Sequence, residues 1–277
     1  MAKEAVRLGT VQETLLLTLY GRARDLGARR PMLADRKSAE LVARIDYDFT
    51  KFRGASLPLA VLRTAMFDVW VRRFLDEHPE GTVVELGVGL NTRSDRVDNG
   101  RARFFDLDLP DAIALRRRFF HDTERFTMLA GSLVDPDWID QVAAAPGPYF
   151  FVSEGVLTYL TEDKARTALR QVATRFPGSL VAFDTGGRAA IDRQDRNPVL
   201  EVLSARMHWA CDDPSSLAEW GLHLLESRTL ADPQPELAPR LPWLYRHGLR
   251  LISRVLPPEF GAYRLNLYQA AEADSTH

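Results

Sequence analysis

Cysteine is almost absent from this chain, whose 277 residues include only Cys211. One thiol cannot form a disulfide within the chain or a cysteine-based metal cluster, and such sparse usage is typical of a reducing cytosol. Long apolar runs are lacking too, because the best stretch, residues 15–20, is far shorter than the roughly 20 residues of a membrane span. We therefore expect a soluble, cytoplasmic protein without a metal site.

The chain also lacks an excess of one charge. Thirty-six basic residues face 38 acidic ones, which leaves a formal net charge of −2. Such a balance produces no overall field that would attract nucleic acid or an anionic membrane, so neither is expected as a partner. Hydrophobic residues make up 45% of the chain, enough for a sizeable core. The sequence leaves the oligomeric state open.

The chain has two regions that differ in their hydrophobic periodicity. Apolar residues recur at helical spacing in residues 11–30, 32–44 and 57–78. From residue 82 onward, short β-rich runs alternate with helical stretches, which predicts βαβ units. Strands are expected at residues 82–88, 103–109, 126–133, 149–155, 179–184, 222–229 and 263–269, the first five of them parallel.

These patterns predict one α/β domain over residues 1–277, with an N-terminal helical cap (1–80) and a Rossmann-like core (81–277). The alternation breaks at residues 186–216, which we expect to form an insertion over one end of the sheet, after the fifth strand. An amphipathic helix is predicted at 241–255, before the last strand.

Gly87 and Gly89 stand where the first predicted strand turns into a helix. Glycine at such a turn lets the backbone approach a ligand and adopt dihedral angles that other residues avoid. A dinucleotide-binding fingerprint would have a third glycine at position 92, where this chain has Thr92, so NAD is disfavoured. Glu85, just before the turn, suits a ligand with a cationic end and no phosphate, such as S-adenosylmethionine.

The second predicted strand carries two acids, Asp106 and Asp108, 19 and 21 residues beyond Gly87. This is near the spacing at which a carboxylate meets the ribose hydroxyls of an adenosine. Strand alternation puts both side chains on one face, and Asp108 is nearer the carboxyl end, where ligands of parallel sheets bind. Asp108 is the predicted ribose ligand. For Asp106, a structural hydrogen bond to a neighbouring loop is the main alternative.

Four blocks now stand in order along the chain: Glu-Leu-Gly-Val-Gly-Leu-Asn-Thr-Arg at 85–93, Phe-Phe-Asp-Leu-Asp-Leu-Pro at 104–110, Ala-Gly-Ser-Leu at 130–133 and Ser-Glu-Gly-Val-Leu-Thr-Tyr-Leu at 153–160. Together they resemble the leucine carboxyl methyltransferase family, most closely its bacterial branch of tetracenomycin-type polyketide O-methyltransferases. The likeness extends from about residue 14 to residue 185 and fades beyond. It implies a Rossmann-like class I methyltransferase fold with a seven-stranded, mostly parallel sheet, and S-adenosylmethionine as cofactor.

The resemblance also implies roles for individual residues. Arg63 matches an arginine that pairs with the cofactor carboxylate, and Glu154 matches an acid near the cofactor's amino acid end. Ser132 and Leu133 match a pair that flanks the adenine, although the family often has an acid where Ser132 stands. The cofactor site implied in this way comprises Arg63, Glu85, Gly87, Gly89, Arg93, Asp108, Ser132, Leu133 and Glu154.

Some of these charges have structural alternatives. Arg63 could be a solvated charge on its helix, and Arg93 could serve a structural ion pair. Glu154 could instead cap the helix that starts near Thr161. The three arginines at 116–118 are expected to form a solvated helix face.

The methyl acceptor is less defined by the sequence. Methyl transfer from a sulfonium is an in-line displacement, so a carboxylate acceptor needs no general base, whereas a phenol would benefit from one. The candidate bases are Tyr159, His208 and His223. Candidate substrate contacts are Tyr20, Arg22, Arg188 and Trp209, with Arg22 matching a basic residue that closes over the site in relatives.

We therefore expect an S-adenosylmethionine-dependent O-methyltransferase that acts on a carboxylate or phenol of a small molecule, namely a polyketide-type secondary metabolite. Two alternatives stay open. One is a protein of the same fold that binds the cofactor but catalyses a non-methylating step such as cyclisation. The other is a methyltransferase of protein C-terminal carboxylates.

Overall fold

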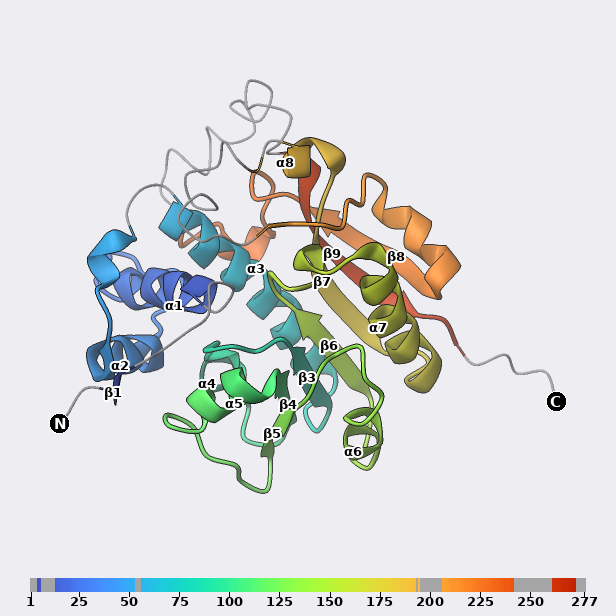
Figure 1. Ribbon diagram of the computed structural model, residues 1–277, viewed down its shortest axis with the longest axis horizontal. Helices are drawn as coiled ribbons and strands as arrows, with labels where there is room; N and C mark the ends of the chain where they lie inside the picture. The colour runs from blue at the N-terminus through green and yellow to red at the C-terminus, as the bar shows by residue number, and fades with distance from the viewer. Residues whose placement is uncertain are drawn as a thin grey trace.

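A computed structural model describes residues 4–5, 13–52, 56–192, 194, 206–241 and 261–272. Its centre is a seven-stranded sheet with the order β5-β4-β3-β6-β7-β9-β8 (Figure 1). The strands are β3 (Thr82–Leu86), β4 (Arg103–Asp108), β5 (Phe126–Ala130), β6 (Tyr149–Ser153), β7 (Leu180–Gly186), β8 (Leu222–Arg228) and β9 (Tyr263–Ala270). β3 to β7 are parallel, and β9 runs antiparallel to both β7 and β8. The predicted seven-stranded, mostly parallel sheet is confirmed.

The ends of the strands differ from the prediction by up to three residues. β3 stops at Leu86 because Gly87 turns the chain with a φ of +78°. β7 continues to Gly186, two residues beyond its predicted end, because β9 supplies a hydrogen-bonding partner as far as Tyr263. This pairing lies at the carboxyl end of the parallel strands.

Helices α1 (Glu13–Asp25), α2 (Arg36–Arg44) and α3 (Ser56–Glu77) precede the sheet. The second starts later than predicted, because both carboxylate oxygens of Asp25 hold the turn by accepting from the backbone N–H groups of Met32 and Leu33. The Asp35 side chain then caps α2 by accepting from the N–H of Ser38. Short parallel strands β1 (Glu4–Ala5) and β2 (Ile45–Asp46) also pair, which the sequence did not predict.

Apart from η1, the remaining helices and 3-10 turns lie between strands of the sheet along the chain. They are α4 (Arg93–Val97), α5 (Pro110–Arg116), α6 (Ile139–Ala143), α7 (Glu162–Arg175) and α8 (Arg188–Asp192), with 3-10 turns η1 (Phe49–Lys51), η2 (Leu157–Tyr159), η4 (Pro214–Trp220) and η5 (Pro235–Leu237). α5 begins with a proline, whose fixed φ suits the first turn of a helix. The helix predicted at 241–255 falls almost entirely outside the described residues, as does much of the 186–216 insertion beyond α8.

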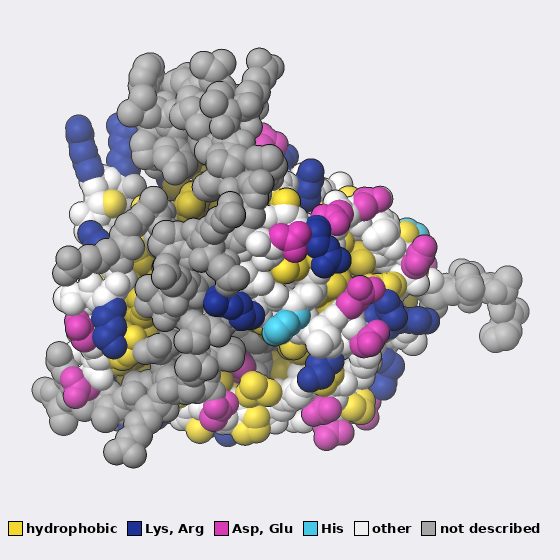
Figure 2. Space-filling model, turned by 45° about the horizontal axis from the view of Figure 1, so that its top comes forward, with side chains coloured by type: hydrophobic (Ala, Val, Ile, Leu, Met, Phe, Trp, Pro, Cys, Tyr) yellow, Lys and Arg dark blue, Asp and Glu magenta, His cyan; other side chains and the backbone are white. Residues whose placement is uncertain are grey.

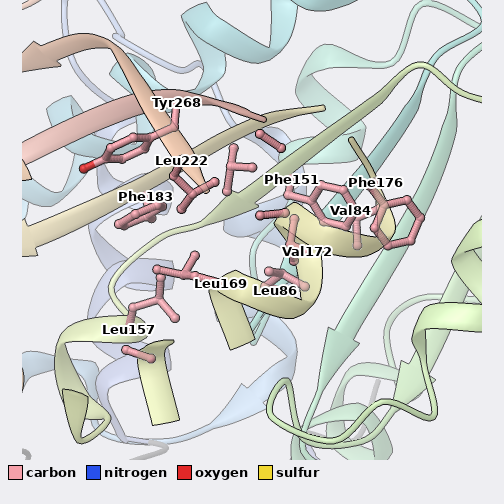
Figure 3. Packing of buried hydrophobic residues seen from close by; sticks show 14 of the residues in the cluster. Val84, Leu86, Phe151, Leu157, Leu169, Val172, Phe176, Phe183, Leu222 and Tyr268 are labelled. Carbon is pink, nitrogen blue, oxygen red and sulfur yellow. The ribbon is translucent and has the colours of Figure 1, made fainter. Parts of the chain in front are cut away.

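Side-chain alternation along the strands builds an apolar core on each face of the sheet. Val84 and Phe151 point to the face covered by α7, where they pack with Val172 (Figure 3). Their neighbours Val83 and Phe150 point to the opposite face, which α3 covers. The sheet is therefore buried on both sides, as expected for parallel strands joined by helices.

Charges of both signs are mixed on the described surface, as the balanced composition suggests. Figure 2 shows basic and acidic side chains interspersed over the described part of one face. In the part of the chain that the structure describes, no helix is both long enough and apolar enough to cross a membrane.

Candidate functional site

The glycine turn, residues 87–91, joins β3 to α4 at the carboxyl end of the sheet. Gly87 and Gly89 both have positive φ, +78° and +50°, which other residues rarely adopt. A Cβ on Gly87 would lie 2.5 Å from Cγ2 of Val156, and one on Gly89 would clash with Leu15. The turn is thus enclosed between the loop after β6 and helix α1, and both positions require glycine.

Asp108 ends β4 directly beside this turn. Its Oδ2 accepts from the N–H of Gly89 at 2.6 Å, and its Oδ1 accepts from the N–H of Leu109 at 2.7 Å. Burial raises the pKa of the Asp108 carboxyl, although the two backbone hydrogen bonds oppose the shift. Leu109, the next residue, keeps half of its surface exposed, which is unusual for a large apolar side chain in this structure. No sequence pattern singled out Leu109.

Asp106 and Arg116 form a buried ion pair beneath the turn. Oδ2 of Asp106 accepts from Nε and Nη2 of Arg116 at 3.0 and 2.6 Å. Nη1 of Arg116 donates to the carbonyls of Gly89 at 3.1 Å and Asn91 at 2.6 Å. The prediction of a solvated face at 116–118 is wrong for Arg116, which is 1% exposed, because the last turn of α5 returns over the glycine turn. The pairing of Asp106 is structural, but its partner is a helix residue and not the neighbouring loop that was the alternative to a ribose contact.

Glu154 follows β6 and faces two arginines. Its carboxylate accepts from Nε of Arg63 at 3.0 Å, Oγ1 of Thr64 at 2.7 Å and Nη2 of Arg93 at 2.8 Å. Burial alone would raise the pKa of this carboxyl, but the guanidinium groups of Arg63 and Arg93 lower it to about 2. Glu154 is therefore an anion. It does not cap α7, whose N-cap residue is Thr161.

Arg93, the first residue of α4, is 1% exposed and binds three carboxylates. Besides Glu154, it contacts Asp68 at 2.5 Å and Glu85 at 3.3 Å. Glu85 also accepts from the side-chain amide of Asn91, and burial raises the pKa of its carboxyl. The structural ion pairs considered for Arg93 are present, yet its buried Nε has no hydrogen-bond partner among the described residues.

The N-terminal helices are tied to the glycine turn by polar contacts. Nη2 of Arg22 donates to the carbonyl of Leu90 at 2.9 Å, and burial lowers the pKa of Arg22 to about 10. Thr92, which replaces the third glycine of a dinucleotide fingerprint, donates to Asp35 at 2.5 Å and accepts from Arg96 at 2.6 Å. Asp35 and Arg96 were not predicted from the sequence.

Asp68 was missed as well, although an acid within the apolar face of α3 was a usable signal. It is fully buried and accepts from Arg96 at 2.7 Å in addition to Arg93. An unpaired buried carboxylate would be costly, so an acid at such a position implies a cationic partner.

The residues predicted to contact the methyl acceptor lie in different parts of the structure. Tyr20 and Tyr159 pack against the same apolar cluster of the N-terminal helices, and the Tyr20 ring stacks on Phe49 with a centroid distance of 5.3 Å. The His208 side chain is exposed at the carboxyl end of the sheet, and the backbone N–H of this residue donates to the carbonyl of Thr158 at 2.8 Å.

Two other candidates are poorly placed to contact the methyl acceptor. His223 pairs with Gln269, and Gln269 pairs with Leu180, so His223 lies at the opposite end of the sheet from the glycine turn. Trp209 is 2% exposed and stacks on Trp220 in the core, which favours a packing role.

The last predicted residues lie at strand ends. Ser132 and Leu133 follow β5 at the carboxyl end of the sheet and are half-buried. Arg188 begins α8 with an exposed side chain, and its N–H donates to Asp212 at 2.7 Å. No group of three or more His, Cys, Asp or Glu side chains suited to a metal ion occurs within the described ranges.

Known proteins resemble this chain in sequence and in fold. The sequence model of the leucine carboxyl methyltransferase family matches residues 23–173, more than half of the chain. The tetracenomycin polyketide synthesis O-methyltransferase TcmP of Streptomyces glaucescens is 34% identical over 245 residues, which cover 84% of this chain and 90% of the relative. A protein of Gibberella zeae named S-adenosyl-L-methionine-dependent methyltransferase dpfgK is 29% identical, covering 78% of this chain and 80% of its own length.

A solved structure supports the fold. A protein from Thermobifida fusca, provisionally named a methyltransferase, superposes with a TM-score of 0.58 at 17% identity, covering 91% of this chain and 94% of that one. Together with the sheet order, this likeness confirms the predicted Rossmann-like methyltransferase fold. The family match and the relative in Streptomyces glaucescens confirm the resemblance carried by the four sequence blocks, and the chain belongs to the leucine carboxyl methyltransferase family.

Proposed function

We propose that this chain transfers the methyl group of S-adenosylmethionine to a carboxylate or phenolic oxygen of a small molecule of the polyketide type. One observation carries the proposal. Arg63 and Glu154 present opposite charges 3.0 Å apart beside the glycine turn, and Asp108 lies on the other side of that turn. The cofactor carries a carboxylate, an ammonium group and ribose hydroxyls, and these three side chains match them in charge and hydrogen-bonding type.

Each part of the cofactor has a suitable group in this chain. Arg63 would bind the carboxylate, Glu154 the ammonium group and Asp108 the ribose. The exposed side chain of Leu109 and the half-buried Leu133 would contact the adenine. The buried Nε of Arg93, which has no hydrogen-bond partner in the part of the chain that the structure describes, adds a polar atom.

When bound, the cofactor supplies a methyl group on a cationic sulfur that is open to in-line attack. The residues of this chain mainly hold and orient the two reactants and exclude water. Leu15 of α1 lies against Gly89 and would shield the turn from solvent. A carboxylate acceptor would need no proton transfer.

The acceptor is argued from the apolar cluster and from the relatives. Tyr20 and Tyr159 pack against the same apolar cluster, and their rings would suit a flat, largely apolar molecule. The relative from Streptomyces glaucescens is named for polyketide synthesis, which supports the same acceptor class. If the acceptor is a phenol, His208 is the better placed base, since burial raises the pKa of the Tyr159 hydroxyl and His223 lies at the far end of the sheet.

Titration calorimetry with S-adenosylmethionine tests the cofactor site. We expect Asp108→Ala to weaken binding at least about tenfold, since the loss of a hydrogen bond to a charged group costs roughly 1.5–3 kcal/mol. Asp111→Ala, at an exposed acid of the same segment, serves as the matched control and should bind like the wild type. Undiminished binding by Asp108→Ala would overturn the assignment.

Because Asp108 also accepts from the N–H of Gly89, melting temperatures must accompany the titrations, and Asp108→Asn is a second variant that keeps the shape of the side chain.

Methyl transfer itself is tested by release of S-adenosylhomocysteine with candidate acceptors. A labelled product that survives mild alkali would exclude an ester and indicate a phenolic ether. Binding without S-adenosylhomocysteine release from any phenol or acid would favour a non-methylating reaction.

A further inference from the structure

The Arg63 guanidinium is held on two sides and open on a third. Its Nε donates to Glu154 at 3.0 Å, and its Nη1 donates to the hydroxyl of Tyr263 at 3.1 Å. Nη2 has no hydrogen-bond partner among the described residues, and the side chain keeps 18% of its surface exposed. The open edge is therefore the one that can receive a ligand.

The backbone of Gly155 packs directly against this guanidinium. A Cβ on Gly155 would lie 3.1 Å from both Nη1 and Nη2 of Arg63, and the residue has a φ of +67°. Glycine is required here because the cation lies directly on the chain.

Tyr263 and Asp184 complete the enclosure of Arg63. The Tyr263 hydroxyl donates to Oδ2 of Asp184, and both oxygens of Asp184 accept from the N–H of Gly155 at 2.9 Å. Asp184 is fully buried near the end of β7, and the register between β7 and β9 brings Tyr263 beside Gly186. The contacts thus run from Arg63 through Tyr263 and Asp184 to the backbone of residues 154–155, and Glu154 returns them to Arg63.

The hydroxyl of Tyr263 also keeps Asp184 from binding Arg63 directly. Oδ2 of Asp184 stays 3.7 Å from Nη1, beyond ordinary hydrogen-bond distance. A carboxylate in direct bidentate contact would occupy both Nη1 and Nη2. With the hydroxyl in between, the anion stabilises the cation while Nη2 stays available.

We propose that Tyr263 and Asp184 are positioning residues that fix the Arg63 guanidinium for the carboxylate of the cofactor's amino acid moiety. The inference rests on the proposed cofactor role of Arg63. Arginine is a long side chain with many rotamers, so an arginine that is already fixed loses less conformational freedom when a carboxylate binds. Neither positioning residue touches the cofactor.

The test compares two ligands, S-adenosylmethionine and 5′-methylthioadenosine, which lacks the amino acid moiety. Tyr263→Phe should weaken the former about tenfold, because the freed Arg63 side chain then loses more conformational freedom when the carboxylate binds, and leave the latter unchanged. The readout is the ratio of the two dissociation constants, which a general loss of stability does not move.

Tyr268→Phe is the matched control. Tyr268 is on the same strand and is fully buried, but its hydroxyl donates to the carbonyl of Pro214, away from Arg63. This variant should lower the melting temperature without changing the ratio. If Tyr263→Phe does not fold, Asp184→Asn replaces it with the same expected change in the ratio.

Arg63→Met separates the inference from the proposed function. If Arg63→Met changes the ratio and the Tyr263 variant does not, or if the latter weakens both ligands equally, the positioning role is refuted and the cofactor site stands. If Arg63→Met leaves the ratio unchanged, the cofactor role of Arg63 is refuted, and the inference with it.

Discussion

Replacing Arg116 with methionine should both destabilise the protein and weaken cofactor binding. Arg116 is 1% exposed, and its guanidinium makes two hydrogen bonds to Asp106 and two to carbonyls of the glycine turn. Methionine has a similar length but no charge or donor. The variant therefore leaves a buried carboxylate without its cation and two carbonyls without donors.

The expected loss follows from these contacts. Breaking a buried ion pair by removing one partner costs about 3–5 kcal/mol, because the remaining charge stays buried. The double variant Asp106→Leu with Arg116→Met removes both charges and should be about 2 kcal/mol less destabilised than the sum of the single variants. It should not regain wild-type stability, since the carbonyls of Gly89 and Asn91 still lack a donor.

Urea unfolding followed by tryptophan fluorescence gives the free energies, because the chain has five tryptophans. Calorimetry with S-adenosylmethionine, well below each melting temperature, then reports on the turn. Arg117→Met is the control from the same segment; its side chain is half exposed, and we expect a change below about 1 kcal/mol.

A loss of less than about 1 kcal/mol in Arg116→Met, together with wild-type cofactor binding, would show that Arg116 does not support the turn. A double variant whose loss equalled the sum of the single variants would show that the two charges are not coupled.

Two further predictions concern titratable groups. The pKa of Glu154 falls from its ordinary 4.5 to about 2 on folding, so its charge stabilises the protein fully above pH 4.5, and this contribution is lost as the pH falls toward 2. At pH 7, Glu154→Gln should therefore be less stable by about 3 kcal/mol in urea unfolding, and the gap should narrow by about 1.4 kcal/mol at pH 3.5; an equal gap at both pH values would contradict the prediction. Burial raises the pKa of the Cys211 thiol to about 12, so thiol reagents at pH 8 should label it slowly in the folded protein and rapidly in urea, whereas rapid labelling of the folded protein would disprove this.

The sheet and the position of Asp108 beside the glycine turn could be predicted because their signals are local. Alternation of β-rich runs and helical periods marks the strands within a few residues, and parallel order follows from the helical crossovers. Gly87 directly follows β3 and Asp108 ends β4, and consecutive strands commonly lie side by side in such folds. The proximity of the turn to Asp108 thus needed no knowledge of long-range contacts, and the ribose role of Asp108 stays a prediction.

The partners of the buried charges could not be predicted in the same way. Arg116 looked like part of an exposed arginine run, because a run of like charges carries no sign of the acid that one member will meet. Arg63 binds Glu154, 91 residues away, and Tyr263, 200 residues away. No periodic pattern encodes such pairs.

The glycine turn, the acid beside it and the family could all be identified from the sequence, since each depends on residues that are adjacent in the chain or on neighbouring strands. That Asp68, Asp184 and Tyr263 belong to the surroundings of the site follows from tertiary contacts alone. A buried charge is stable only beside a partner. Which partner it meets depends on the elements that the topology brings together, here α3 with β6, β7 and β9.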